Sequence, residues 1–229
     1  MTHHEVERYS AGARWFHWAI TIAALVLAVT GLFLYVPAFS GIAEDSYTRI
    51  IHRVAAVIFV AAPLLFFLAK PGRSLHFVKE IFTWGKDDLA WLKAAPDYYF
   101  GGDAKKMPPQ GDMNTGQKLW AVVAFFSALG FIFTGIFMWF LKDSLPAEVF
   151  TWMVIVHDLC LIVGGAMLLV HLYLGAIHPR MPESLKSMIK GKVSAEYAQS
   201  HHGKWYKEVA GREGAAKGTL DGQGEKQAH

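Results

Sequence analysis

The sequence predicts an all-α integral membrane protein, built as a four-helix, up-down-up-down bundle. Apolar residues gather into four blocks long enough to span a bilayer, and most lysines and arginines lie in alternate segments between those blocks. The 229 residues are 53% hydrophobic and only 18% charged, a balance typical of membrane chains. We predict the four helices at about residues 15–36, 50–69, 117–141 and 150–177.

The first predicted helix, 15–36, follows a polar N-terminus of residues 1–14 and ends before Pro37. It is too long for the core of a signal peptide and no convincing small-residue cleavage site follows it, so we expect it to be retained. The second helix, 50–69, contains Pro63. A membrane helix tolerates proline when neighbouring groups satisfy the freed carbonyl.

A long loop, residues 70–116, joins the second helix to the third. Its first part mixes aromatic and aliphatic residues with lysines and acids, as an interfacial helix lying in the headgroup region would. A docking surface for a partner subunit suits the same pattern equally well, so both interpretations stay open. The rest of the loop is a Gly/Pro-rich connector.

The membrane domain therefore covers residues 15–178, and a polar tail, 179–229, follows it. The single cysteine, Cys160, excludes an internal disulfide and lies within a predicted span, where it acts as a small packed residue. The net charge of +3 is too small to indicate a nucleic-acid partner.

Lysine and arginine predict the orientation of the chain. The N-terminus carries two of them, the 70–115 loop seven and the tail nine, whereas the opposite side carries only Arg49, Arg53 and Lys142. We therefore expect a multi-pass protein of the bacterial cytoplasmic (inner) membrane, surrounded by lipid, with both termini and the long loop in the cytoplasm.

Four histidines within the predicted spans fall into two pairs at matching depths. His17 and His171 lie near the cytoplasmic ends of the first and fourth helices, while His52 and His157 lie near the outer ends of the second and fourth. His157 and His171 are two heptads apart on one face, roughly 21 Å along the helix axis. Ionisable groups inside a membrane are costly and point to function.

Each pair supplies two imidazoles from different helices, as a six-coordinate haem b requires. We therefore predict two haem b groups, with His17, His52, His157 and His171 as axial ligands of the iron. The chain has no CxxCH motif for covalent haem attachment, and two ligands per level are too few for zinc.

A single histidine at a helix end, such as His17 or His52, is more often an interfacial residue than a ligand. The agreement of all four in depth and face favours ligation. His178 is a second-ranked competitor for His171. We expect the remaining histidines, outside the spans, to be solvated: His3, His4, His76, His201, His202 and His229.

Gly31 follows His17 by fourteen residues and so faces the same way at the outer depth. Its missing side chain would let a porphyrin approach the backbone. Close helix packing through small residues is the alternative for Gly31, and likewise for Gly130, Gly135, Gly164 and Gly165. Residues 30–33 (TGLF) and 134–137 (TGIF) suggest a repeat between the first and third helices, too short to establish one.

Arg53 and Asp158 each follow a predicted ligand and lie at similar depth. We predict that they pair with each other, or that Arg53 binds a haem propionate.

Several motifs resemble the gamma subunit, a dihaem cytochrome b, of membrane-bound formate dehydrogenases. The resemblance covers nearly the whole chain. It rests on the sequences RWFHW at 14–18, IH at 51–52, NTGQK at 114–118, HLY at 171–173, and above all MIKGKVS at 188–194 with HHGKWY at 201–206.

The resemblance implies a membrane anchor for an iron–sulfur beta subunit and a molybdenum- or tungsten-containing alpha subunit on the outer face. It also implies electron flow from the clusters through the outer and then the inner haem to a quinone, with Asn114, Gly116 and Gln117 at the quinone site. A helix N-cap formed by Asn114 or Thr115 is compatible with that role. The central loop, 74–113, is longer than in better-known members.

Other functions stay open beside this one. Cytochrome b anchors of nickel–iron hydrogenases and of polysulfide or thiosulfate reductases share the design and differ in the electron donor. A stand-alone dihaem quinol oxidase would need no partner, and a haem-free transporter or structural anchor would line a path with its polar residues. The quinone type (menaquinone or ubiquinone), the reaction direction and a higher oligomer of the complex are left open.

Overall fold

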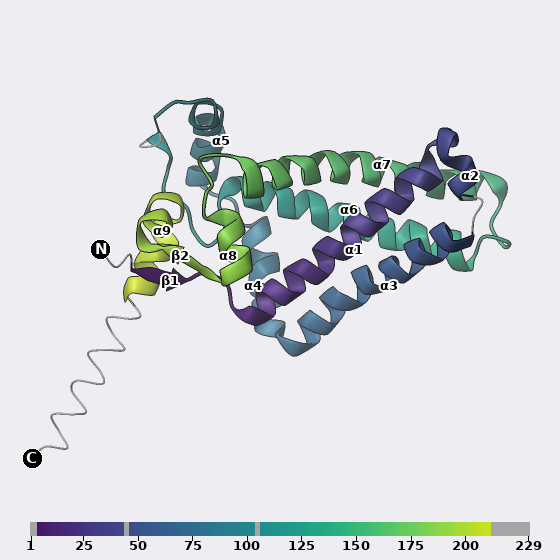
Figure 1. Cartoon of the computed structure of the whole chain (residues 1–229), viewed down its shortest axis with the longest axis horizontal. Coiled ribbons are helices and arrows are strands. Elements are labelled where there is room, and N and C mark those ends of the chain that lie inside the picture. The colour runs from purple at the N-terminus through teal and green to yellow at the C-terminus, as the bar shows by residue number, and fades with distance from the viewer. Residues whose placement is uncertain (1–3, 44–45, 104–105, 212–229) are drawn as a thin grey trace, which may run out of the picture.

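The structure is a computed structural model that describes residues 4–43, 46–103 and 106–211. Four of its helices are long and apolar enough to cross a membrane: α1 (Ala11–Tyr35), α3 (Ser46–Ala69), α6 (Thr115–Phe140) and α7 (Ala147–Leu172). They lie along one another with alternating direction (Figure 1). The predicted all-α membrane bundle is confirmed.

The long helices form two hairpins, because α1 packs along α3 and α6 packs along α7, whereas contacts between the hairpins are sparse. Small residues bring α6 and α7 together: a Cβ on Gly130 would overlap the Cys160 sulfur, and one on Gly164 would lie 3.1 Å from the Ser127 hydroxyl. Close helix packing therefore accounts for these two glycines.

Helix ends follow local chemistry. The Ser10 side chain accepts a hydrogen bond from the Ala13 N–H, so α1 begins four residues before the predicted start. At its other end the chain turns at Pro37 through a 3₁₀ turn, η1 (Pro37–Phe39), and the short helix α2 (Ser40–Ala43). A π-helical turn, η3 (Tyr173–Ile177), extends α7.

The 70–116 loop contains two helices, α4 (Pro71–Phe82) and α5 (Lys86–Tyr99). The two helices are separate because Gly85 is the N-cap that begins α5. The Gly85 N–H donates to the Asp88 carboxylate at 2.8 Å. Apolar residues of α4 such as Leu75 and Phe82 are exposed, as an interfacial helix requires. In contrast, Trp91 and Tyr98 of α5 are buried within the chain itself.

The two ends of the chain fold together. Strand β1 (Glu5–Glu7) pairs antiparallel with β2 (Lys192–Ser194), with Val6 opposite Val193. These valines pack with Tyr197 and Ala198 of helix α9 (Ala195–His201), beside helix α8 (Ser184–Lys190). We call residues 4–10 and 181–211 the terminal unit; residues 212–229 of the predicted tail lie outside the described residues.

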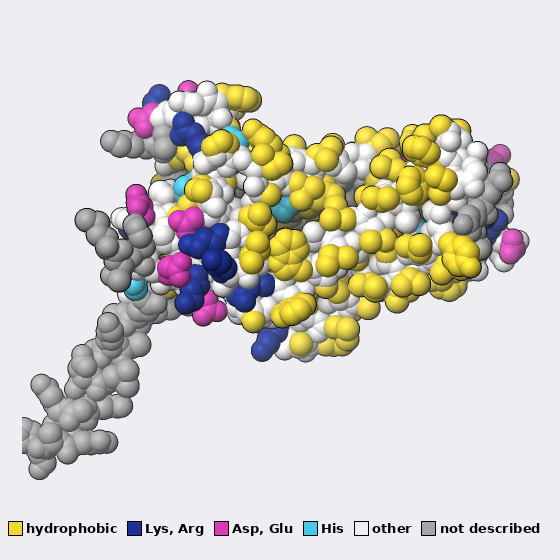
Figure 2. All heavy atoms as spheres, viewed as in Figure 1, with side chains coloured by type: hydrophobic (Ala, Val, Ile, Leu, Met, Phe, Trp, Pro, Cys, Tyr) yellow, Lys and Arg dark blue, Asp and Glu magenta, His cyan; other side chains and the backbone are white. Residues whose placement is uncertain are grey.

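Figure 2 shows how charge is distributed over this fold. Apolar side chains cover the long helices, and charged side chains gather at the end that carries the terminal unit. We call this the terminal end of the bundle, and the end with α2 and the α6–α7 loop the opposite end.

The predicted solvation of His201 and His202 is wrong. His202 is only 5% exposed, and its Nδ1 lies 3.0 Å from the Gly111 carbonyl. The half-buried His201 contacts the Tyr98 hydroxyl at 3.1 Å. The apolar core of the terminal unit covers the HH segment, and no local pattern in the sequence indicates this.

Acid is expected to loosen the terminal unit. Burial, together with the charge of Arg8, lowers the pKa of His202 from 6.5 to about 3. The folded unit therefore keeps His202 neutral, while the unfolded chain takes up a proton below pH 6.5. Stability is then lost as pH falls from about 6.5 towards 3, by up to about 1.4 kcal/mol per pH unit.

Hydrogen exchange of peptides from residues 192–206, corrected for intrinsic rates, measures this loss. A His202→Gln variant is expected to retain only the weaker acid response of His201, whose pKa burial also lowers. Equal acid sensitivity in both proteins would contradict the assignment to His202.

Candidate cofactor site

The four predicted ligands meet as two pairs between the hairpins. The ring centroids of His17 on α1 and His171 on α7 lie 6.5 Å apart, with the ring planes at 58°. Those of His52 on α3 and His157 on α7 lie 6.4 Å apart, at 53°. We call these the inner pair, towards the terminal end, and the outer pair, towards the opposite end.

The separation of the rings fits one metal ion per pair. An imidazole nitrogen bonds a transition metal at about 2.0–2.1 Å, and the ring centre lies about 1.2 Å behind it, so two axial imidazoles have centroids roughly 6.4 Å apart. Within the described ranges, no group of three or more His, Cys, Asp or Glu could hold a metal. The arrangement suits a group that brings its own equatorial ligands, as a porphyrin does.

Each ring of the outer pair contacts a buried threonine of the neighbouring helix. The Thr30 hydroxyl lies 2.8 Å from Nδ1 of His52, and the Thr134 hydroxyl lies 2.7 Å from Nδ1 of His157. Gly31 lies at the same level, where a Cβ would be 3.6 Å from the His52 ring. The predicted placement of Gly31 beside the outer pair agrees with this contact.

The rings of the inner pair contact aromatic side chains instead. His171 stacks on Trp120 of α6, with centroids 4.9 Å apart and planes at 14°. His17 meets the edge of Trp18 at 5.3 Å, and its buried Nδ1 has no hydrogen-bond partner within the described chain.

His178, the competitor for His171, is buried elsewhere. Its ring contacts the edges of Tyr99 and Tyr173 at 5.1 and 5.5 Å, and its Nδ1 accepts from the Arg180 N–H. It thus packs between α5 and the end of the fourth span, and His171 is the residue that faces His17.

The predicted ion pair between Arg53 and Asp158 does not form. The Arg53 guanidinium lies over the Trp139 ring, 5.3 Å from its centroid, and none of the ion pairs within residues 4–43, 46–103 and 106–211 joins Arg53 to Asp158. Similar depth on two helices does not make two side chains face each other. A cation–π contact replaces the ion pair.

The predicted quinone residues open helix α6 at the terminal end. Asn114 is the N-cap: its side-chain oxygen accepts from the Gln117 N–H, and the Gln117 side-chain oxygen accepts from the Asn114 N–H, both at 2.9 Å. The two amide NH₂ groups are left as donors. Gln117 lies one turn before Trp120, the ring that stacks on His171.

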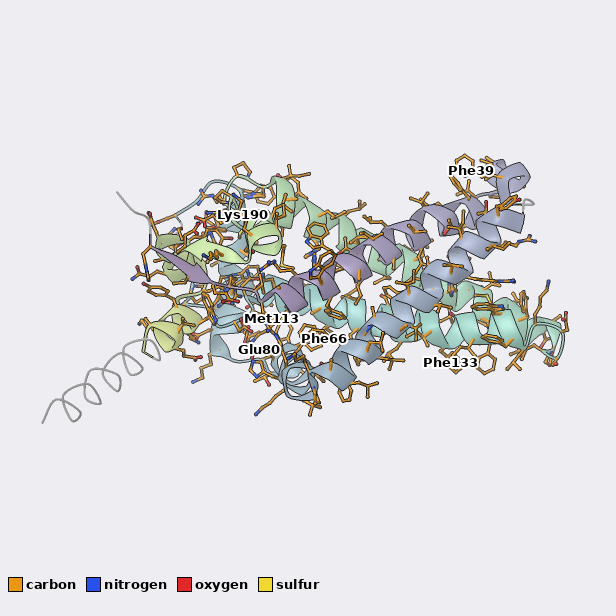
Figure 3. The ribbon with its side chains drawn as sticks, turned by 60° about the horizontal axis from the view of Figure 1, so that its bottom comes forward. Phe39, Phe66, Glu80, Met113, Phe133 and Lys190 are labelled. Carbon is orange, nitrogen blue, oxygen red and sulfur yellow. The ribbon has the colours of Figure 1, made fainter. Side chains whose placement is uncertain are left out.

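Helix α5 covers this segment. A Cβ on Gly116 would come within 2.8 Å of the Trp91 ring, so glycine permits the close approach of α5. In Figure 3, Glu80 and Met113 lie towards the terminal end and Phe39 towards the opposite end. The candidate quinone segment therefore lies at the level of the inner pair.

A buried ion network joins α4, α5 and α6 beside the same segment. The Lys118 ammonium lies 3.3 Å from Asp88 and 3.6 Å from Glu80, and donates to the Thr83 carbonyl at 3.0 Å. The Thr115 hydroxyl donates to Asp88 at 2.8 Å.

Sequence reasoning missed the roles of Thr30, Thr134, Trp120, Trp91 and Asp88. The TGLF and TGIF segments contain the two threonines, and their repetition was the available signal. No signal pointed to Trp91 or Asp88, because their contacts depend on how α5 docks.

Comparisons with known proteins identify the family of the chain. The family model described as prokaryotic cytochrome b561 matches residues 8–191. The chain is 27% identical over 202 residues to the cytochrome b556(Fdn) subunit of the nitrate-inducible formate dehydrogenase of Escherichia coli (strain K12), covering 84% of this chain and 86% of that protein.

Two further relatives carry similar names. The formate dehydrogenase cytochrome b556(fdo) subunit of the same strain is 24% identical over 212 residues, 89% of this chain and 93% of that protein. The formate dehydrogenase cytochrome b556 subunit of Haemophilus influenzae is 23% identical over 211 residues, which cover 88% of this chain and 82% of that protein.

Proposed function

Because the chain belongs to the prokaryotic cytochrome b561 family, we propose that it is the membrane-anchor dihaem cytochrome b subunit of a formate dehydrogenase complex. In this role it passes electrons from an iron–sulfur subunit through two haems to a quinone. The relatives named above, which match over most of their length, support the choice of formate dehydrogenase.

The observation that carries the proposal is the meeting of two histidine pairs between the hairpins, with centroids 6.5 and 6.4 Å apart. His17 and His171 would hold the inner haem, and His52 and His157 the outer one. Each haem, when bound, supplies one-electron redox chemistry. The chain itself orients three of the four rings: Trp120 stacks on His171, and Thr30 and Thr134 contact His52 and His157.

Quinone binding is assigned to the start of α6. Reducing a quinone requires hydrogen-bond donors at its carbonyl oxygens and a source of protons. The amide NH₂ groups of Asn114 and Gln117 are suitable donors, because their oxygens are already occupied by backbone N–H groups. Gly116 lets Trp91 of α5 pack closely against this segment.

Orientation and partners complete the proposal. The excess of lysine and arginine at the terminal end supports a cytoplasmic location for that end. The iron–sulfur subunit and the molybdenum or tungsten catalytic subunit would then contact the opposite end, near the outer pair. Formate oxidation and quinone protonation would occur on different sides of the membrane.

The test is purification of the complex from native membranes through a tag on this chain. We expect two haems b per chain by pyridine haemochrome, co-purification of the two large subunits, and reduction of both haems by formate. A His76→Ala variant, in the exposed part of α4, serves as control and keeps two haems. A folded chain without haem would overturn the proposal. Reduction of the haems by hydrogen instead of formate would show that the chain is the anchor of a hydrogenase.

A further inference from the structure

Two threonines occupy equivalent places in the two hairpins, each beside one ring of the outer pair. Thr30 lies on α1 and contacts His52 on α3, 22 residues later in the chain. Thr134 lies on α6 and contacts His157 on α7, 23 residues later. Both threonines are buried, at 7% and 0% exposure. This gives a structural reason for the threonine that the TGLF and TGIF segments share.

The proton of each hydroxyl can be located from its contacts. The Thr30 oxygen lies 2.7 Å from the Val26 carbonyl, and the Thr134 oxygen lies 2.7 Å from the Gly130 carbonyl. A carbonyl can only accept, and two acceptors at that distance would repel each other, so each hydroxyl donates its one proton to the carbonyl.

The threonine oxygen is then an acceptor towards histidine. Nδ1 of His52 and of His157 must carry the proton and donate it to threonine. With the proton on Nδ1, the lone pair of each ring is on Nε2, the nitrogen left for a metal. The two hairpins thus present the outer pair in one defined tautomer.

The inner pair lacks this arrangement. Its rings contact Trp120 and Trp18, and the Nδ1 of His17 has no partner within the described chain. The two pairs therefore differ: in the outer pair the Nδ1 of each ring contacts a threonine hydroxyl, and in the inner pair the Nδ1 of His17 has no such contact.

We propose that Thr30 and Thr134 are positioning residues that hold the outer pair in the Nδ1–H tautomer and lower the reduction potential of the haem bound there. This inference rests on the proposed function, in which the outer pair ligates a haem. A hydrogen bond from Nδ1–H makes the imidazole a stronger electron donor, which favours ferric iron. Lowering the outer potential relative to the inner one favours electron flow from outer to inner.

The experiment is a redox titration of the purified complex, with Thr30→Val, Thr134→Val and the double variant compared with the unmodified chain. Valine keeps the shape and removes the acceptor. At a fixed potential, each change is expected to raise the reduced-to-oxidised ratio of the outer haem by about twofold to tenfold, the range of one hydrogen bond. The inner haem is expected to titrate as before.

Two controls separate positioning from packing. Thr151→Val removes an exposed hydroxyl that donates to the Ala147 carbonyl on α7, and it is expected to change neither potential. Thr30→Ser restores the acceptor and is expected to restore the outer potential. The low-spin ferric EPR signal of the outer haem should change with valine and return with serine.

An unchanged outer potential in the double variant, or an equal shift of both haems, would overturn the inference. Loss of the outer haem from Thr30→Val with retention in Thr30→Ser supports it, whereas loss from both overturns it. Absence of haem from the unmodified complex would instead refute the proposed function, so the two failures are distinguishable.

Discussion

Replacing His171 with alanine is expected to remove one of two haems and to stop quinone reduction. His171 is the α7 member of the inner pair and faces His17 at 6.5 Å, so its loss leaves one axial ligand at that level. The outer pair, formed by His52 on α3 and His157 on α7, keeps both of its ligands. Haem content should fall from two to one per chain, and the remaining haem should still be reduced by formate.

The loss of quinone reduction should be large. Changing a group that merely orients a metal ligand typically costs about 10–100-fold in affinity or activity. Removing the ligand itself should exceed that, so we expect quinol formation to fall by more than about 100-fold. Haem analysis, formate-driven spectra and quinol assays on one preparation measure all three quantities.

His178→Ala is the matched control, because His178 lies seven residues after His171, just past the end of the span, and packs against Tyr99 and Tyr173 instead of His17. It is expected to keep two haems. Loss of haem from His178→Ala but not from His171→Ala would reverse the ligand assignment, while loss from neither would remove His171 from the site.

The membrane bundle and the family could be predicted from sequence because both rest on long, regular signals. A helix rises by a fixed amount per residue, so histidine positions translate into depth, and the two pairs follow. The resemblance to formate dehydrogenase gamma subunits is confirmed by the family match and the named relatives.

The terminal unit could not be predicted in the same way. Strands β1 and β2 have three residues each and are separated in sequence by the entire bundle. Such short, distant strands carry almost no periodic signal. The buried His202 depends on this non-local pairing, and so it was assigned to solvent.

Side-chain partners within the bundle were predictable only in part. The positions of Arg53 and Asp158 along their helices predict a similar depth in the membrane. Whether the two side chains face each other depends on the rotation of α3 relative to α7, and in the structure Arg53 lies over Trp139. Thr30 and Thr134 looked like ordinary helix residues, since a threonine in an apolar helix commonly bonds its own backbone. Their second contact, to histidine, requires the neighbouring helix.

Replacing Lys118 with methionine is expected to detach α5 from the start of α6. The side chains of Lys118 and Asp88 are each only 10% exposed, and their charged atoms lie 3.3 Å apart. Methionine fills similar space but leaves Asp88 buried without its cation. Removing one partner of such a pair typically costs about 3–5 kcal/mol.

The pKa of Asp88 indicates the same dependence. Burial alone would raise this pKa, but hydrogen bonds from the Gly85 N–H, the Thr115 hydroxyl and Lys118 outweigh it and lower the pKa below 3.8. The stabilisation is therefore present above that value and lost as pH falls through the lowered pKa. In Lys118→Met the pKa of Asp88 should rise, so that α5 loosens at a higher pH than in the unmodified chain.

Hydrogen exchange across residues 83–100 measures the docking of α5. Lys93→Met, an exposed lysine on the same helix, should leave exchange unchanged. Asp88→Asn combined with Lys118→Met should cost less than the sum of the single changes, because the double variant leaves no buried charge unpaired within the Lys118–Asp88 pair. Additive effects would show that the two side chains contribute separately.

The quinone assay extends this prediction from stability to the proposed site. Trp91 of α5 packs on Gly116, which lies between Asn114 and Gln117 in the sequence, so loosening α5 should disturb the proposed quinone segment. Lys118→Met should therefore raise the KM for quinone while both haems remain bound and formate-reducible, because neither histidine pair contacts Lys118. If α5 loosens and the KM is unchanged, the quinone does not bind at the start of α6.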